Sequence, residues 1–184
     1  MTATVALVSL GCAKNLVDSE VMLGLLEQAG FEIVDEVDEA DAVIVNTCGF
    51  IKPAAEESLD ALLDLADLKR GRCRALICAG CLTQRYADGL AEQLPEVDAF
   101  FGPDAVPEVA RIVSEALDGR GALSAETPRY LMDAATPRLR TGAEWLACVK
   151  IAEGCDHACG YCLIPQLRGR YRSRPPHDLR VEVH

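Results

Sequence analysis

Five short apolar runs, separated by longer stretches with apolar residues at helical spacing, dominate the first part of the sequence. The runs lie at residues 4–10, 31–34, 41–47, 74–80 and 98–102. The intervening patterns predict helices over residues 16–30, 53–68, 83–93 and 106–117. This alternation predicts an α/β fold in which helices cover both faces of a parallel sheet. We expect a flavodoxin-like or Rossmann-like sheet with the strand order 2-1-3-4-5.

The chain divides into two units with different charge. Residues 1–118 carry 8 basic and 22 acidic side chains, whereas residues 119–184 carry 10 basic and 7 acidic ones. Residues 119–144 are rich in Gly, Pro, Thr and Arg without a sustained period, which predicts a linker before a second unit at 145–184. There the segment 144–154 predicts a strand. The acidic first unit argues against its binding nucleic acid through phosphates.

Nine cysteines occur in a chain that has no features of a secreted protein. No basic residue precedes the first apolar run, and no run approaches the ~20 apolar residues of a membrane span. We therefore expect a cytoplasmic protein, in which an odd number of cysteines serves metals or catalysis more often than disulfides.

Three cysteines lie close together in the sequence, at Cys155, Cys159 and Cys162. A structural zinc site takes four protein ligands. An iron-sulfur cube can be held by three thiolates, which leaves one iron open to bind a substrate or cofactor. A zinc site that recruits His157 or His177 is the alternative.

Three further cysteines follow separate predicted strands. Cys12 comes after the first strand, Cys48 after the third and Cys81 after the fourth, each beside a glycine. In the expected strand order these strands are neighbours, and ligands of such sheets lie beyond the carboxyl ends of the strands. The sequence therefore predicts a second three-thiolate site.

The other cysteines have simpler interpretations. Cys78 and Cys81 match a C-x-x-C redox pair, but Cys78 lies inside a predicted strand, where such pairs do not normally occur. Cys73 and Cys148 are expected to pack as small hydrophobic side chains.

Four stretches of the sequence together resemble the radical S-adenosylmethionine methylthiotransferase family. They are "SLGCAKNLVDSE" (9–20), "NTCGFI" (46–51), "AGCLTQRY" (79–86) and "KIAEGCDHACGYCLIPQLRGRYRSR" (150–174). Within the family the chain is more similar to the RimO branch, which modifies an aspartate of a small-subunit ribosomal protein. The alternative MiaB branch, which modifies an adenosine of transfer RNA, typically has Gln-Met in place of Ala13-Lys14 and Asn in place of His157.

The resemblance implies two 4Fe-4S clusters and S-adenosylmethionine as cofactors. Its ligands would be Cys12, Cys48 and Cys81 for an auxiliary cluster, and Cys155, Cys159 and Cys162 for the radical-generating one, with Tyr161 beside the cofactor. It further implies hydrogen removal from the β-carbon of the target aspartate, delivery of a methylthio group to that carbon, and a reductant such as flavodoxin or ferredoxin. It does not identify catalytic side chains.

Three other expectations concern polar residues and length. Asp18 and Glu20 are expected to fix the loop and the helix start. If extended, residues 168–174 would place Arg168, Arg170, Arg172 and Arg174 on one face, either for contact with cofactor, protein or RNA or as a solvated edge.

A (β/α) barrel needs ~200 residues, so we expect the truncated start of a radical S-adenosylmethionine barrel and an inactive fragment. A non-catalytic iron-sulfur or zinc module is the alternative.

Overall fold

The computed structural model describes residues 2–183 and contains a six-stranded parallel sheet. The strand order is β2-β1-β3-β4-β5-β6. The bounds of the strands are β1 Thr4–Ser9, β2 Glu32–Ile33, β3 Ala42–Thr47, β4 Ala75–Gly80, β5 Ala99–Phe101 and β6 Ala122–Ser124. The predicted α/β class and the order of the first five strands are confirmed. The central strands β3 and β4 are buried at every position, as expected of a parallel sheet covered on both faces.

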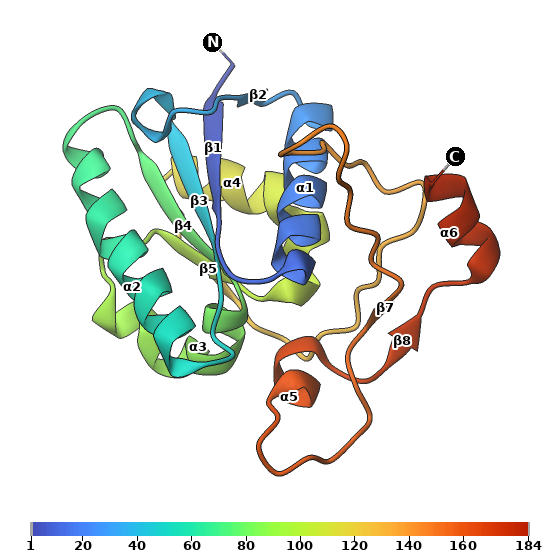
Figure 1. The fold of residues 1–184 in the computed structure, drawn as a ribbon. Coiled ribbons are helices and arrows are strands. Elements are labelled where there is room, and N and C mark those ends of the chain that lie inside the picture. Colours follow the sequence, from blue (N-terminus) through green and yellow to red (C-terminus); the bar gives the residue numbers. More distant parts are fainter. Residues whose placement is uncertain (1, 184) are drawn as a thin grey trace.

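Helices cover both faces of this sheet (Figure 1). α1 and α4 pack on one face, and α2 and α3 pack on the other. The α-helices are α1 Ala13–Gln28, α2 Lys52–Ala66, α3 Cys81–Gln93 and α4 Val109–Leu117, with short 3-10 helices at Val37–Glu39, Asp67–Arg70 and Pro103–Glu108. Within residues 2–183, no helix is long and apolar enough to cross a membrane.

Two helices differ from the sequence prediction near their ends. The helix expected over 106–117 is divided, because Pro107 lies in the 3-10 segment and has no backbone N–H to continue an α-helix. α3 is kinked at Tyr86, whose backbone is not helical. Both helices still pack against the sheet, α4 in one core cluster and α3 in the other.

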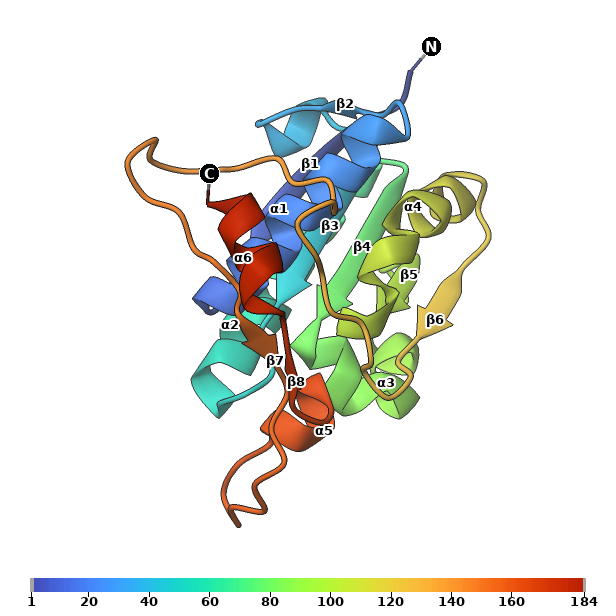
Figure 2. The ribbon, with the colours of Figure 1, turned by 90° about the vertical axis from the view of Figure 1, so that its right-hand side faces the viewer.

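The chain beyond α4 differs more from the prediction. β6 adds a parallel edge strand beside β5, in a segment without strand periodicity in the sequence. The strand expected over 144–154 is wrong except at β7 Ala152–Glu153, because β7 pairs with the equally short β8 Arg172–Ser173. The two remaining helices are α5 Ile164–Arg168 and α6 Pro176–Glu182. This C-terminal part lies along α1 (Figure 2).

Gly24 permits the close packing of residues 137–138 on α1. A Cβ atom added at Gly24 would lie 2.6 Å from the backbone N of Arg138 and 2.7 Å from the carbonyl carbon of Pro137. Backbone atoms cannot move aside as the end of a long side chain can. The glycine therefore fixes how closely the segment after β6 approaches the helix.

We expect Gly24→Ala to lower the free energy of unfolding by about 1–3 kcal/mol, the usual cost of forcing extra volume into a packed site. Gly89→Ala in α3 is the matched control, because its Cβ would meet a single atom, Nε2 of Gln93 at 3.5 Å. The control should be neutral or stabilise the protein by up to about 1 kcal/mol through helix propensity. Urea unfolding of both variants, followed by circular dichroism, checks this. Equal changes in unfolding free energy for Gly24→Ala and Gly89→Ala would contradict this prediction.

Candidate functional site

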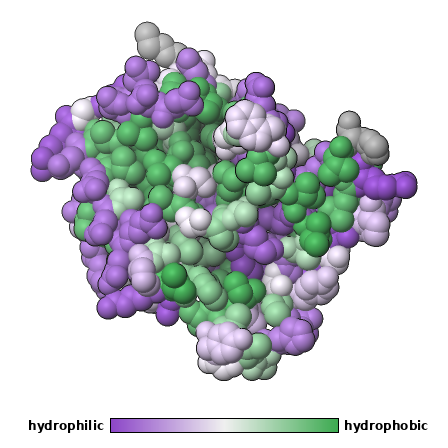
Figure 3. All heavy atoms as spheres, viewed as in Figure 1, coloured by the Kyte–Doolittle hydropathy of each residue, from purple (hydrophilic) through white to green (hydrophobic). Residues whose placement is uncertain are grey.

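Three cysteines from separate parts of the sequence line one cavity at the carboxyl edge of the sheet. Cys12 precedes α1 and is exposed, whereas Cys48 follows β3 and Cys81 begins α3, and both of these are buried. The cavity has a volume of about 520 Å³ and a mostly apolar lining. In the view of Figure 3, apolar surface runs between α1 and α2 and continues toward α5. The predicted convergence of the three residues is therefore seen in the fold.

Two glycines allow close packing next to the cysteines of this cavity. Gly11 has a φ of +88°, and a Cβ there would lie 2.7 Å from the Cβ and 3.2 Å from the Sγ of Cys48. Gly80 has a φ of +96°, and its Cβ would lie 2.4 Å from the side-chain oxygen of Asn46. Both positions combine a left-handed backbone with a close approach, so a side chain at either would distort the site.

Asn15 supports the cavity from the first turn of α1. Its Nδ2 donates hydrogen bonds to the carbonyl oxygens of Leu10 (3.0 Å) and Thr47 (2.9 Å), which lie at the ends of β1 and β3. Its Oδ1 accepts hydrogen bonds from the guanidinium of Arg168 and from the Sγ of Cys81, the latter at 3.9 Å. The amide thus joins two strand ends, one cysteine and the C-terminal segment.

Burial keeps the thiols of Cys78 and Cys81 protonated in the metal-free protein. Burial raises the pKa of Cys81 to about 11, although the charge and a hydrogen bond of Arg168 act in the opposite direction. Burial also raises the pKa of Cys78 to about 11 against hydrogen bonds from Thr83 and Thr47. A thiolate is the reactive form, so neither thiol is an active nucleophile near neutral pH. This argues against a Cys78–Cys81 redox pair.

The second cysteine set lies in the loop between β7 and α5. Cys155 and Cys162 are half-buried, Cys159 is exposed, and Tyr161 is 88% exposed. The loop is closed by hydrogen bonds from the backbone N–H of Cys155 to the oxygen of Gly169 (3.1 Å) and of Cys162 to that of Cys159 (3.0 Å). The first of these bonds holds the beginning of the loop against the residue that follows α5.

Neither set forms a finished metal site in the described chain. Among the side chains that the structure describes, no three Cys, His, Asp or Glu residues are arranged to hold a metal ion. His157 and His177 are both exposed and do not complete a zinc site with the cysteines. The N-terminal set still fits an iron-sulfur group by its chemistry, because three thiols border one cavity of mostly apolar lining.

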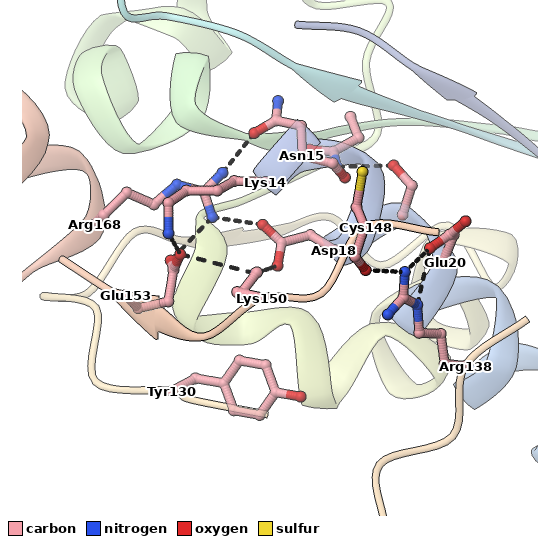
Figure 4. Close-up of polar contacts among 12 residues, drawn as sticks. Lys14, Asn15, Asp18, Glu20, Tyr130, Arg138, Cys148, Lys150, Glu153 and Arg168 are labelled. Atoms are coloured by element: carbon pink, nitrogen blue, oxygen red, sulfur yellow. Dashed lines mark hydrogen bonds and ion pairs between the residues drawn. The ribbon is translucent and has the colours of Figure 1, made fainter. Parts of the chain in front are cut away.

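A buried network of ion pairs connects the two cysteine sets (Figure 4). The carboxylate of Asp18 in α1 accepts hydrogen bonds from Lys150 and, at 2.5 Å, from Arg168. Glu153, next to the cysteine loop, contacts Lys14 at 2.8 Å and Arg168 at 3.2 Å. Asp18, Lys150, Glu153 and Arg168 are buried, so the network excludes water where the C-terminal part meets α1.

Glu20 makes a second connection of the same kind. Its carboxylate accepts hydrogen bonds from Arg138 and, at 2.9 Å, from the backbone N–H of Thr141. Asp18 and Glu20 are therefore structural, as expected, but they fix the C-terminal part on α1 and not the preceding loop.

The expected shared face of four arginines is wrong. Arg168 ends α5 and is buried, Arg170 is exposed, and Arg174 is buried against Asp178 and Glu182. The reason is that α5 and the following Gly169, with a φ of +73°, interrupt the extended course that the alternation requires. Sequence reasoning also missed Asn15 and Lys150. For Lys150 the one available signal was a charged residue within the mainly apolar run at 145–152.

Comparisons with known proteins agree with these motifs. Residues 4–102, more than half of the chain, match Uncharacterized protein family UPF0004. The chain is 55% identical over 184 residues to the ribosomal protein uS12 methylthiotransferase RimO of Heliobacterium modesticaldum, covering all of this chain and 40% of the relative. The RimO protein of Trichlorobacter lovleyi is 53% identical over 181 residues, covering 97% of this chain and 40% of the relative.

The chain thus spans about two fifths of the length of these curated relatives. Its match to the family covers β1 to β5 together with Cys12, Cys48 and Cys81. On this match, the chain belongs to the protein family UPF0004.

Proposed function

We propose that this chain is the N-terminal part of a RimO-type methylthiotransferase, which adds a methylthio group to the β-carbon of an aspartate in ribosomal protein uS12. The observation that carries the proposal is the cavity shared by Cys12, Cys48 and Cys81, joined by buried ion pairs to the segment with the second cysteine set. The names of the relatives favour a ribosomal protein substrate over transfer RNA. A ribosomal protein substrate supports a cytoplasmic location, and we further propose a flavodoxin-like or ferredoxin-like reductant as a partner.

Each cysteine set would hold one 4Fe-4S cluster. Cys12, Cys48 and Cys81 would hold one, and Cys155, Cys159 and Cys162 the other, with Tyr161 next to bound S-adenosylmethionine. When bound, these cofactors supply the electron transfer and the sulfur chemistry. The residues of the chain bind and orient the cofactors and exclude water. Phe50, Ile51 and Leu167 line the N-terminal cavity and serve this last role.

We further propose the division into a cluster domain at 1–118, a connecting segment at 119–144, and the start of a radical S-adenosylmethionine domain at 145–184. The division rests on the two core clusters, which draw most of their residues from 1–118. A non-catalytic metal-binding module is the second candidate, because the same cavity could hold a metal group without catalysis.

Iron counting tests the two-site assignment directly. The 184-residue chain would be reconstituted anaerobically with iron and sulfide, and its iron measured by elemental analysis and Mössbauer spectroscopy. Two 4Fe-4S clusters predict about eight irons, and alanine replacement of all three cysteines in either set should leave about four. Zinc in place of iron, or iron that neither replacement reduces, would overturn the assignment.

A chimaera separates the enzyme from the non-catalytic module. The matching segment of the Heliobacterium modesticaldum relative would be replaced by this chain, and the chimaera expressed in cells that lack their own enzyme. We expect the mass of uS12 to rise by one methylthio group. A chimaera with two intact clusters that modifies neither uS12 nor transfer RNA would favour the module.

A further inference from the structure

Arg168 lies between the two cysteine sets and lines the same cavity as Cys12, Cys48 and Cys81. It is 2% exposed, although it carries a full charge. Three side chains hold its guanidinium: Asp18 at 2.5 Å, Glu153 at 3.2 Å, and the amide oxygen of Asn15. A guanidinium with this many partners has one orientation, because its donors form a rigid planar fork.

The guanidinium also shares a hydrogen-bond partner with a cysteine sulfur. The oxygen of Asn15 accepts a hydrogen bond from Arg168 and one from Cys81, and all three residues line the same cavity. Arg168 is therefore more than the partner of two carboxylates.

We propose that Arg168 places a fixed positive charge in the wall of this cavity and thereby raises the reduction potential of the iron-sulfur group held by the N-terminal cysteine set. Hydrogen bonds to sulfur and nearby charge both set the potential of such groups, and a fixed positive charge favours the reduced form. Through Glu153, two residues before Cys155, the same guanidinium links this site to the second set. The inference rests on the proposed function.

The test uses a background in which Cys155, Cys159 and Cys162 are all alanine, so that one cluster remains. An anaerobic redox titration followed by electron paramagnetic resonance would compare Arg168→Gln and Arg168→Lys with this background. We expect Arg168→Gln to lower the ratio of reduced to oxidised cluster about tenfold at a fixed potential, which is about 59 mV for a one-electron couple. Arg168→Lys should lie between, because it keeps the charge and loses the planar fork.

Arg174→Gln is the matched control. Arg174 is equally buried and pairs with two carboxylates, but it does not line the cavity. Its replacement should destabilise the chain without moving the potential. Iron bound at an unchanged potential in Arg168→Gln would overturn this inference alone. If Arg168→Gln binds no iron, an unchanged potential in Arg168→Lys would overturn the inference in the same way. A background variant that binds no iron would overturn the proposed function and this inference with it.

Discussion

Asp18→Ala is expected to lower the free energy of unfolding by about 3–5 kcal/mol, because removing one partner of a buried ion pair leaves its cations uncompensated. Lys150 and Arg168 both direct their charges at this carboxylate and are themselves buried. Urea unfolding of the metal-free chain, followed by circular dichroism, measures the change. If residues 150–168 instead detach from α1 before the sheet unfolds, limited proteolysis will detect this local unfolding.

Asp67→Ala is the control for this prediction. Asp67 pairs with Arg70 across the surface, with 73% and 83% of the two side chains exposed, and its removal should change the unfolding free energy by less than about 0.5 kcal/mol. An equally small effect of Asp18→Ala, together with unchanged proteolysis, would show that the buried pairs do not hold the C-terminal part.

The pH dependence of unfolding gives an independent measure of the same carboxylate. Burial by itself would raise the pKa of Asp18, but the charges and hydrogen bonds of Arg168 and Lys150 outweigh burial and lower the pKa below its ordinary value of 3.8. A lowered pKa contributes stability that is complete above about pH 4 and is lost as the pH falls through the folded-state value. The unfolding free energy of Asp18→Ala should therefore fall less steeply below about pH 4 than that of the parent chain.

The strand order of the sheet could be predicted from local sequence patterns, because these patterns determine the order. The runs that became β1, β3 and β4 are continuous and apolar, and short helical connections leave few topologies for a parallel sheet. The meeting of Cys12 with Cys81 followed from the same order, because the carboxyl ends of neighbouring parallel strands share one edge. Their distance along the sequence, taken alone, gives no indication that these residues meet.

The C-terminal part could not be predicted in the same way. Its structure depends on Arg168, Lys150 and Glu153, which the sequence presents as ordinary surface charges. Lys150 and Arg168 are buried because Asp18 offers a carboxylate more than 130 positions away in the sequence, and Glu153 is buried because it pairs with Arg168. No local pattern carries that pairing. β6 was missed for a different reason, since it is a three-residue edge strand with an exposed Leu123.

Gly11→Ala is expected to abolish metal binding at the N-terminal cysteine set while leaving the second set intact. The added Cβ would lie 2.7 Å from the Cβ of Cys48, a separation that real Cβ atoms essentially never show, at a backbone φ of +88°. Either the cysteine or the turn after β1 must move, and the move separates Cys12 from Cys48. Reconstituted iron should fall from about eight to about four per chain, the content of one 4Fe-4S cluster.

Gly119→Ala separates displacement of the cysteine from simple backbone strain. Gly119 has a φ of +75°, similar to that of Gly11, but an added Cβ there meets no atom within 4 Å. Both substitutions therefore pay the cost of a left-handed alanine, and the one at Gly11 alone touches the site. The control should retain all of its iron with a modest loss of stability. Equal iron in the two variants would mean that the N-terminal site tolerates movement of Cys48, and the close approach at Gly11 would then have no part in holding the cluster.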